Sequence, residues 1–348
     1  MTHAERFCAL MDFKPVDRLP MVEWATWWDL TIARWEQEGL PLSRTYSDAK
    51  NRDDDLYLEI SRHFGLDLYQ HQCFWASWAR AASPGANIIT DEADYEAVHG
   101  DLFPSNAQYQ FLFDRLAKCQ ASQDRGDSLL RLSFYGFFAL PRVLFGDEQH
   151  FYAFYDYPDL MHRINRENAE FMIRILHQAC KVCKPVFLAI GEDMSYNNGP
   201  MLSKALFDEF LAPYYRKVIP VMKELGIRVL VDSDGDANEL LLWLAEVGVE
   251  GLLPMERNAG SDAVATRKKL PHFLMIGNFE KLLMTKGETA VRAEFERLLP
   301  VMKQGGFIPS PDHQTPPQVS LEQYRTYIRL LKEYSIAGVP SRRSTNNK

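Results

Sequence analysis

Two aspartates near the middle of the chain have the type and spacing to support proton transfer or cation binding. Asp232 and Asp234 are two residues apart at the end of an apolar run, so they point to the same face if the strand conformation continues through them. Neighbouring carboxylates repel each other unless a cation or a shared proton relieves the repulsion. Asp236 is better placed to cap the following helix. An EF-hand is excluded, because the sixth and twelfth loop positions are Ala237 and Trp243 instead of glycine and glutamate.

Other titratable residues follow further apolar runs. Glu192 and Asp193 come after one such run, and Glu256 comes after another. His313 lies in the sequence SPDHQTPP, where prolines on both sides restrict the backbone and favour rigid placement of the imidazole. Each of these residues also has an ordinary interpretation, as a helix cap, a solvated group or a surface-loop histidine. The sequence predicts two overlapping sets: catalytic residues Glu192, Asp193 and His313, and metal ligands Asp232, Asp234, Glu256 and His313.

Aromatic residues are concentrated in the first third of the chain. They include the tryptophans Trp24, Trp27, Trp28, Trp35, Trp75 and Trp78, together with Phe74. The simpler interpretation is hydrophobic packing of a helix and an insertion. The alternative is an aromatic wall for a methoxylated ring or a quaternary ammonium group. The predicted substrate-binding residues combine this segment with two other strand ends: Glu23, Trp24, Trp28, Tyr135 and Asn278.

The composition disfavours several classes of function. The 348 residues carry 39 basic and 47 acidic side chains, a formal net charge of −8, which would repel nucleic acid and anionic membranes. No apolar run is long and uncharged enough for a membrane anchor, and the N-terminus shows no signal-peptide pattern. The five cysteines are odd in number and scattered, so we expect a reducing, cytoplasmic compartment.

The motifs of several common enzyme classes are absent. The sequence has no P-loop, no dinucleotide-binding glycine motif after a strand and no nucleophile elbow. The sequence therefore lacks the motifs that would indicate a kinase, a nucleotide hydrolase, a Rossmann dehydrogenase or a serine hydrolase. Cys180 and Cys183 form a C-x-x-C late in a predicted helix without a second pair, which favours helix packing over a zinc or redox site.

Alternating apolar runs and helical segments indicate how these residues are positioned. Short aliphatic runs separated by segments of helical period are typical of parallel strands with crossover helices. Eight strands are predicted, at 19–23, 66–70, 129–134, 185–190, 227–231, 250–254, 273–276 and 306–309. Eight strands alternating with helices predict an α/β fold of the (β/α)8 TIM barrel class. In such a barrel the acids and His313 would share one mouth at the carboxyl ends of the strands.

Helix signals and turn signals complete the predicted organisation. Helices are predicted at 158–182 and 287–303, near 105–123, and after two capping-box pairs, Asp236 with Glu239 and Ser320 with Gln323. The barrel is expected to have an N-terminal helical segment and a hairpin-like insertion at 76–104, around Pro84-Gly85. Residues 1–336 are predicted to form a single domain. Residues 337–348 lack apolar content and are predicted to form a flexible tail.

Six segments spread over almost the whole chain carry a family pattern. They are ERFCALMDFKPVDRLP, LAIGEDMSYNNGPMLSKALFDEFLAPYYRKVIPVMKELGI, VLVDSDGDANELL, GLLPMER, LMIGNFEK and GGFIPSPDHQTPPQVSLEQY. Together they resemble the uroporphyrinogen decarboxylase superfamily. The resemblance implies a (β/α)8 barrel, in agreement with the strand pattern. It also implies one of two chemistries: decarboxylation of uroporphyrinogen without a cofactor, or zinc-dependent methyl exchange with corrinoid proteins.

Departures from the family motifs distinguish these two chemistries. The resemblance implies an arginine-rich R-Q-A-G-R segment soon after the first strand of a true decarboxylase, but this chain has EWATWWDLTIARWEQEGLP. Glu23 and Asp29 in that segment would repel a carboxylated substrate where bidentate arginine pairing is needed. The resemblance places His313 where decarboxylases have a histidine and coenzyme M methyltransferases have a zinc-bound cysteine. It places Asp232 and Asp234 where those methyltransferases have an H-x-C pair.

We therefore predict a metal-assisted methyltransferase that moves a methyl group from a small methoxy or methylamine-type substrate to a corrinoid protein. The divalent metal, with zinc as the leading candidate, would stabilise the developing charge on the leaving oxygen. Glu192 or Asp193 would position the substrate or move a proton. A separate partner protein would supply the corrinoid, because the chain shows no cobalamin module. The alternatives are a cofactor-independent decarboxylase of a porphyrinogen or other carboxylated substrate and, ranked third, a binding protein.

Overall fold

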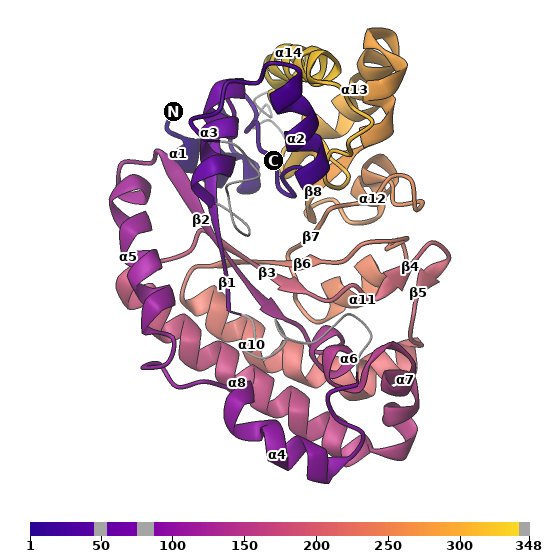
Figure 1. The fold of residues 1–348 in the computed structure, drawn as a ribbon. Helices are drawn as coiled ribbons and strands as arrows, with labels where there is room; N and C mark the ends of the chain where they lie inside the picture. Colours follow the sequence, from indigo (N-terminus) through magenta and orange to yellow (C-terminus); the bar gives the residue numbers. More distant parts are fainter. Residues whose placement is uncertain (45–53, 75–86, 341–348) are drawn as a thin grey trace, which may run out of the picture. The chain divides into compact units, whose positions relative to one another are not determined.

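The protein has an α/β fold built on parallel strands (Figure 1). The computed structural model describes residues 1–44, 54–74 and 87–340. Hydrogen-bonded neighbours in the main sheet follow the order β1-β2-β3-β6-β7-β8-β9, and β4 and β5 form a separate antiparallel pair. The strands are β1 (Leu68–Cys73), β2 (Ser128–Tyr135), β3 (Phe187–Gly191), β4 (Ser195–Tyr196), β5 (Gly199–Pro200), β6 (Arg228–Asp232), β7 (Gly251–Leu253), β8 (Leu274–Phe279) and β9 (Phe307–Pro311).

Helices connect the strands. They are α1 (His3–Met11), α2 (Asp29–Gln37), α3 (Asp54–Phe64), α4 (Glu92–Leu102), α5 (Gln110–Asp124), α6 (Ala139–Phe145), α7 (Asp147–Asp156), α8 (Pro158–Val182), α9 (Lys204–Leu206), α10 (Ala212–Glu224), α11 (Leu240–Glu246), α12 (Ala263–Lys269), α13 (Glu288–Met302) and α14 (Leu321–Ala337). A π-helical turn, η2 (Phe207–Leu211), precedes α10, and a 3-10 helix, η3 (Lys281–Lys286), precedes α13. No helix among the described residues has both the length and the apolar composition needed to cross a membrane.

The chain divides into two compact units, each assembled from segments that are distant in the sequence. Unit 1 comprises Met1–Gln70, Arg125–Leu129 and Leu252–Lys348. Unit 2 comprises His71–Asp124 and Leu130–Gly251. The single domain expected over residues 1–336 stays a prediction.

Most of the strands predicted from the sequence are confirmed, but the one at 19–23 is wrong. Pro20 has no N–H group to donate to a neighbouring strand. The N–H groups on either side bond elsewhere, that of Leu19 to the Ser335 carbonyl at 2.8 Å and that of Met21 to the Asp67 carboxylate at 3.0 Å. The α/β class with parallel strands is therefore shown, whereas the closed eight-stranded barrel stays a prediction.

The helix predictions were accurate where a long apolar period or a matched cap was present. The predicted helices at 158–182 and 287–303 correspond to α8 and α13, and Ser320 and Gln323 form the predicted capping box of α14. The capping box at Asp236 and Glu239 is wrong. The Asp236 carboxylate instead accepts the N–H of Asn238 at 3.0 Å, and α11 begins only at Leu240. A local turn therefore uses the oxygen that would have capped the helix.

The predicted insertion at 76–104 is only partly described. Its centre, Pro84-Gly85, lies outside the described residues, as do Trp75 and Trp78. The described part contains helix α4 in place of a hairpin strand, with the Asp91 carboxylate accepting the N–H of Asp94 as its cap. The last eight residues of the predicted tail also lie outside the described part of the chain.

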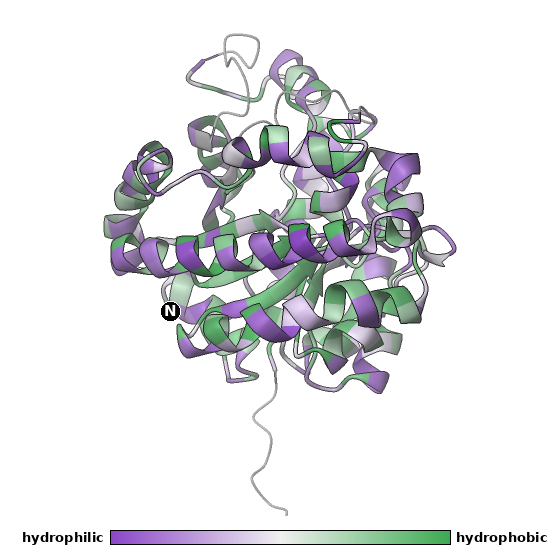
Figure 2. Ribbon diagram, turned by 90° about the horizontal axis from the view of Figure 1, so that it is seen from below, coloured by the Kyte–Doolittle hydropathy of each residue, from purple (hydrophilic) through white to green (hydrophobic). Residues whose placement is uncertain are grey.

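The core of unit 2 is formed by the apolar strands and the helices that cover them. Figure 2 shows strands coloured mainly as hydrophobic and helices with alternating hydrophobic and hydrophilic bands. Helix α8 buries Ile164, Phe171 and Ile175 at helical spacing, which is the pattern of a helix with one face in the core. Two buried amides on the same helix, Asn165 and Asn168, donate to main-chain carbonyls after β2. These bonds fix the loop that leaves β2.

Unit 1 contains a buried carboxylate that holds its N-terminal segment in place. The Asp67 side chain is 2% exposed and accepts hydrogen bonds from Arg18 at 2.6 and 2.8 Å, from Arg6 at 3.3 Å and from the Met21 N–H. The two guanidinium groups and the main-chain donor offset the desolvation of one carboxylate. The arrangement ties α1 and the extended segment after it to the residue that precedes β1.

Replacing Asp67 by asparagine is expected to lower the free energy of unfolding by about 3 kcal/mol, because Arg18 loses its counter-charge and Arg6, which keeps Asp17, loses one of its two acidic partners. Chemical denaturation followed by circular dichroism measures this change. Asp127→Asn is the control, since the Asp127 side chain is 54% exposed and its ion pair with Arg125 lies at the surface; a loss below about 1 kcal/mol is expected there. Equal losses in the two variants would contradict the role assigned to Asp67.

Candidate active site

Polar residues of unit 2 lie side by side at the carboxyl ends of β2, β3 and β6. The strands are parallel, with Tyr135 paired to Gly191 and Gly191 paired to Asp232. Side chains alternate between the two faces of a sheet, and paired residues in parallel strands share a face. Tyr135 and Asp232 therefore lie on one face. We refer to it as the acidic face.

A buried cation that the sequence analysis missed lies on the acidic face. Arg131 of β2 has a side chain 2% exposed, and its Nη2 donates to Oδ2 of Asp232 at 2.6 Å. Its Nε has no hydrogen-bond partner among the described residues. The run SLLRLSFY is buried except at Tyr135, so an arginine within an otherwise apolar strand was a signal that could have been used. The ion pair places one positive charge beneath the acids.

Asp193 holds a proton more tightly than an ordinary aspartate. Loss of hydration, together with the negative charges of Asp234 and Asp232, raises the pKa of Asp193 to about 7. The backbone of Asp193 adopts a φ of 44°, in the left-handed region, which takes it out of the strand alternation. The residue keeps part of its surface exposed to solvent, while its carboxyl group is largely desolvated. Asp193 is therefore a carboxyl group able to exchange a proton near neutral pH.

Glu192 is fully buried and acts as an anchor for the loop after β2. Its carboxylate accepts the N–H groups of Phe137 and Phe138, each at 2.8 Å, and of Ala139 at 3.1 Å, as well as the Tyr215 hydroxyl. Burial raises the pKa of Glu192, and these four donors oppose that rise. The N–H groups belong to the start of α6, where a negative charge is favourable. We therefore interpret Glu192 as a positioning residue, while the proton chemistry predicted for it fits Asp193.

Gly136 shows how closely Glu192 is packed against this loop. A Cβ at position 136 would lie 2.0 Å from Cδ of Glu192, inside any permitted contact distance. The turn after β2 therefore requires glycine for space rather than for backbone conformation. This close approach is what allows three consecutive N–H groups to reach one carboxylate.

The predicted metal ligands do not form a metal site within either unit. Among the described residues, no group of three or more His, Cys, Asp or Glu side chains is arranged to hold a metal ion. In unit 2 the charge on Asp232 is offset by Arg131, and Asp193 relieves part of the repulsion by holding a proton. Glu256 and His313 belong to unit 1. The four-ligand set therefore stays a prediction.

An aromatic cluster in unit 1 surrounds His313. The ring centroids of Trp24 and Trp28 lie 6.1 and 6.4 Å from that of His313. The indole Nε1 of Trp24 donates to the Pro311 carbonyl at 2.8 Å, and a parallel bridge joins Trp27 to Thr315. The segment at 24–28 is thereby fixed against the loop that carries His313. Trp28 is 45% exposed, so part of this aromatic surface is open to solvent.

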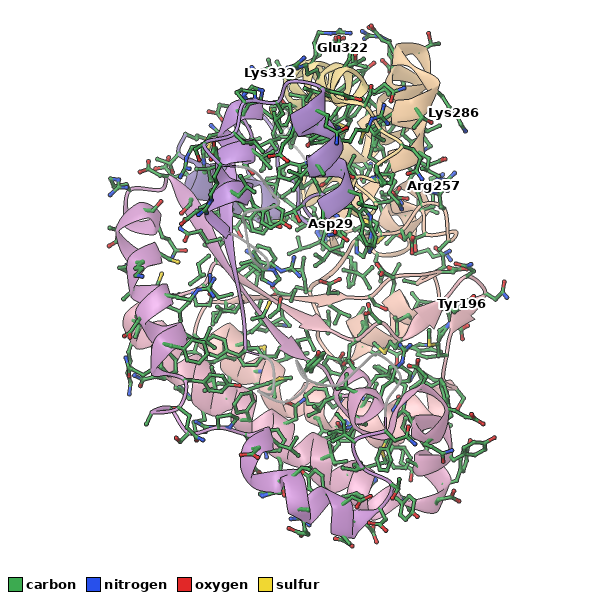
Figure 3. The ribbon with its side chains drawn as sticks, in the orientation of Figure 1. Asp29, Tyr196, Arg257, Lys286, Glu322 and Lys332 are labelled. Atoms are coloured by element: carbon green, nitrogen blue, oxygen red, sulfur yellow. The ribbon has the colours of Figure 1, made fainter. Side chains whose placement is uncertain are left out.

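The residue next to His313 positions a neighbouring loop. Asp312 is fully buried and accepts the N–H groups of Arg257 at 3.0 Å and Lys281 at 3.1 Å, together with the Lys281 ammonium at 3.2 Å. Arg257 itself is labelled in Figure 3. The predicted ligand Glu256 lies 3.8 Å from the same ammonium group. Asp312 thus holds the loop after β7 and the start of η3 together.

Two predicted substrate-binding residues are buried among protein partners. Asn278 is fully buried; its amide donates to the carbonyls of Met255 and Ser261 and accepts the N–H of Ala263. Glu23 is 4% exposed; burial raises its pKa to about 8, against the opposing effect of the hydroxyls of Tyr324 and Tyr327. Both side chains therefore contact protein, and their role in substrate binding stays a prediction.

The C-x-x-C pair behaves as expected for helix packing. Cys183 is buried, and burial raises the pKa of its thiol to about 12. Burial also raises the pKa of Cys180, which is only partly exposed. Thiols that resist ionisation are poor nucleophiles and poor metal ligands.

Comparison with protein families decides the identity of the fold family. The model of the uroporphyrinogen decarboxylase family matches residues 142–334, which is more than half of the chain. The chain belongs to the uroporphyrinogen decarboxylase family. The matched region of this family member includes the Glu192 anchor, Asp193, Asp232 and Asp234 of unit 2, and it includes His313 of unit 1.

One solved structure agrees with this assignment at the level of the fold. A methyltransferase from Methanosarcina mazei matches with a TM-score of 0.67 and 17% identity, over 96% of this chain and 99% of that one. A putative vitamin-B12-independent methionine synthase from Listeria monocytogenes matches with a TM-score of only 0.45 and 8% identity, over 92% of this chain and 97% of that one. No curated protein matches the sequence.

Gly136→Ala is expected to destabilise the family member by about 2 kcal/mol or more, because the new methyl group must displace the Glu192 carboxylate from its donors. Thermal and chemical denaturation measure the effect. Gly100→Ala in α4 is the matched control, since a Cβ there meets nothing within 4 Å, and alanine is the better helix former. A Gly136→Ala protein as stable as the control would show that the close approach to Glu192 is not maintained.

Proposed function

We propose that this member of the uroporphyrinogen decarboxylase family is a methyltransferase acting on a small methylated compound. The observation that carries the proposal is Asp193, a largely desolvated carboxyl group whose pKa is raised to about 7 beside Asp234 and Asp232. The likeness in fold to a protein described as a methyltransferase supports the same reaction class. The proposed reaction is therefore the enzymatic transfer of a methyl group.

Asp193 is suited to protonating a leaving group. When a methyl group is taken from an oxygen or nitrogen, that atom gains the electron pair of the broken bond and needs a proton. A general acid works best when its pKa lies near the working pH, because it is then protonated in a useful fraction of molecules and still gives up its proton readily. An ordinary aspartate with a pKa near 3.9 is already ionised at neutral pH. Burial and the acidic surroundings of Asp193 raise its pKa, so that a useful fraction of the carboxyl groups is protonated at neutral pH.

The aromatic cluster of unit 1 indicates the class of substrate. The faces of Trp24 and Trp28 and the ring of His313 form a surface that is partly open to solvent. Aromatic faces attract methylated ammonium groups and stack on methoxylated rings. We therefore propose a methoxy or methylamine-type substrate, with Trp28 as a binding residue.

The methyl acceptor is proposed to come from outside the chain. The family resemblance implies a corrinoid carried by a separate partner protein, which supplies a strong nucleophile for the methyl carbon when bound. Asp193 of unit 2 would then deliver the proton to the leaving atom. The bound metal proposed from the sequence is a separate question. It is tested by elemental analysis of protein purified without chelator, with Asp234→Ala and His313→Ala as comparisons.

Decarboxylation is the second candidate, because the matching family model is named for it. Carboxylate recognition needs cations, and Arg131 of the acidic face is already paired with Asp232. The negative charges of Asp232 and Asp234 that raise the pKa of Asp193 would also repel a substrate carboxylate. The methyltransferase reaction is therefore better supported by the side chains of unit 2.

The two functions are separated by an anaerobic assay. Purified protein is incubated with a panel of methoxylated aromatics and methylamines and with reduced cobalamin as methyl acceptor, and methylcobalamin is followed by its absorbance. Parallel reactions with a porphyrinogen are analysed for carbon dioxide. Methyl transfer that is lost by about 10²-fold or more in Asp193→Asn supports the proposal. Carbon dioxide release without methyl transfer would overturn it.

The pKa of Asp193 provides a test that needs no substrate. Because the folded protein raises this pKa to about 7, the carboxyl should be protonated below that pH and lose its proton as the pH rises through it. Carboxyl-detected ¹³C NMR measures the titration. Asp234→Asn should move the midpoint to lower pH by removing one repelling charge, whereas Asp208→Asn, whose side chain is 47% exposed beside Lys204, should not. A midpoint near 4 in the wild type would refute the role of Asp193.

Trp28→Ala is expected to raise KM for a methylated substrate by about 3- to 30-fold with little change in kcat, because it removes one aromatic face from binding. Steady-state kinetics measures this split. Leu30→Ala, in the helix α2 that follows Trp28, is the control, since Leu30 is 64% exposed and belongs to no aromatic cluster. An unchanged KM in Trp28→Ala would place the methylated group elsewhere.

A further inference from the structure

A cysteine and a histidine on β1 form a pair to which neither the sequence pattern nor the proposed reaction assigns a role. The Sγ atom of Cys73 lies 3.3 Å from Nε2 of His71, two residues earlier on the same strand. The same Nε2 lies 2.8 Å from the Ser133 hydroxyl on β2. At the sulfur to nitrogen distance, a thiol can donate its proton to the imidazole, or a protonated imidazole can donate to a thiolate.

The pair lies on the acidic face of unit 2. His71 contacts Ser133, which is two residues before Tyr135 on β2 and therefore points to the same side as Tyr135 and Asp232. Cys73 is two residues after His71 and shares its side of β1. The charged groups on this face include the buried Arg131, whose Nε has no hydrogen-bond partner among the described residues, and its partner Asp232. The acids Asp193 and Asp234 follow β3 and β6, and the Arg142 guanidinium donates to the Asp193 carbonyl at 3.1 Å.

Cys73 is partly accessible to solvent and lies beside a base, His71, which distinguishes it from the buried cysteines. It is partly exposed, whereas Cys119 and Cys183 are buried. For Cys183, burial raises the pKa and so suppresses the thiolate. A neighbouring histidine has the opposite effect, because the imidazolium that it forms stabilises a thiolate. Cys8 is the exposed thiol of the chain against which Cys73 can be compared.

We propose that His71 and Cys73 form a thiolate–imidazolium pair, and that Cys73 is a nucleophilic site for small compounds with an electrophilic alkyl carbon. The thiol proton moves from Sγ to Nε2 of His71. The thiolate lone pair then forms a sulfur–carbon bond, while the bond from that carbon to its leaving group breaks and its electron pair departs with the leaving group. The product is a thioether on Cys73, and His71 releases its proton to solvent. This site goes beyond the proposed function and does not depend on it.

The experiment compares Cys73 and Cys8 in the full-length native protein. Iodoacetamide is used as the first probe and methyl 4-nitrobenzenesulfonate, which delivers a methyl group, as the second; peptide mass spectrometry reports the rate at each cysteine from pH 5.5 to 9.5. At pH 6.5 we expect Cys73 to react at least about ten times faster than Cys8. The Cys73 rate should reach half its plateau below about pH 7.5, whereas an ordinary thiol titrates near pH 8.5. Identical pH profiles at the two cysteines would overturn the proposal without any variant.

Substitution of the histidine tests the cause of the reactivity. His71→Gln should lower the Cys73 rate at pH 6.5 by about ten-fold and have a much smaller effect at pH 9.5, where the thiol ionises unaided. The Cys8 rate in the same sample serves as an internal control. His177→Gln, at an exposed position of α8, is the matched variant and should leave both rates unchanged. A Cys73 rate that is insensitive to His71→Gln at pH 6.5 would show that the imidazole does not activate the thiol.

Discussion

Repulsion between carboxylates at the ends of β3 and β6 is the constraint that shapes the acidic face. Asp193, Asp232 and Asp234 are close enough for the charges of the last two to raise the pKa of the first. The protein relieves the repulsion in two ways. Arg131, buried beneath the face, neutralises Asp232, and Asp193 keeps a proton near neutral pH. A fully ionised cluster would destabilise the unit, and the Arg131 ion pair and the proton on Asp193 avoid that state.

Two other acids near the strand ends hold loops in place. Glu192 binds three consecutive N–H groups and a tyrosine hydroxyl, and Asp312 binds two N–H groups and a lysine. In both cases a buried carboxylate is satisfied by donors from a neighbouring loop, which makes its burial tolerable. These anchors give the reactive side chains a rigid support. Asp193 lies next to one anchor in the sequence and His313 next to the other.

The sequence predicted most of the fold because its signals were local. Apolar runs located the strands, and helical periodicity located α8 and α13. The prediction failed at 19–23, where an apolar run that includes Pro20 has its neighbouring N–H groups bound by Ser335 and Asp67, both distant in the sequence. It failed again at Asp236, where a turn with Asn238 competes with the helix cap. Periodicity carries no information about such partners.

The sequence by itself determined the family pattern, the parallel strands and the gathering of acids after them, since each of these depends on residues that are close along the chain. Only the tertiary structure decided which acid binds the N–H groups of a loop and which acid lies beside other negative charges. Glu192 and Asp193 are neighbours in the chain, yet one is fully bonded to N–H groups and the other lies beside two charges. Arg131, His71 and Cys73 join the same face because strand register, which is set by long-range pairing, brings them there. Proton affinity and nucleophilicity depend on these surroundings, and residue type alone does not contain them.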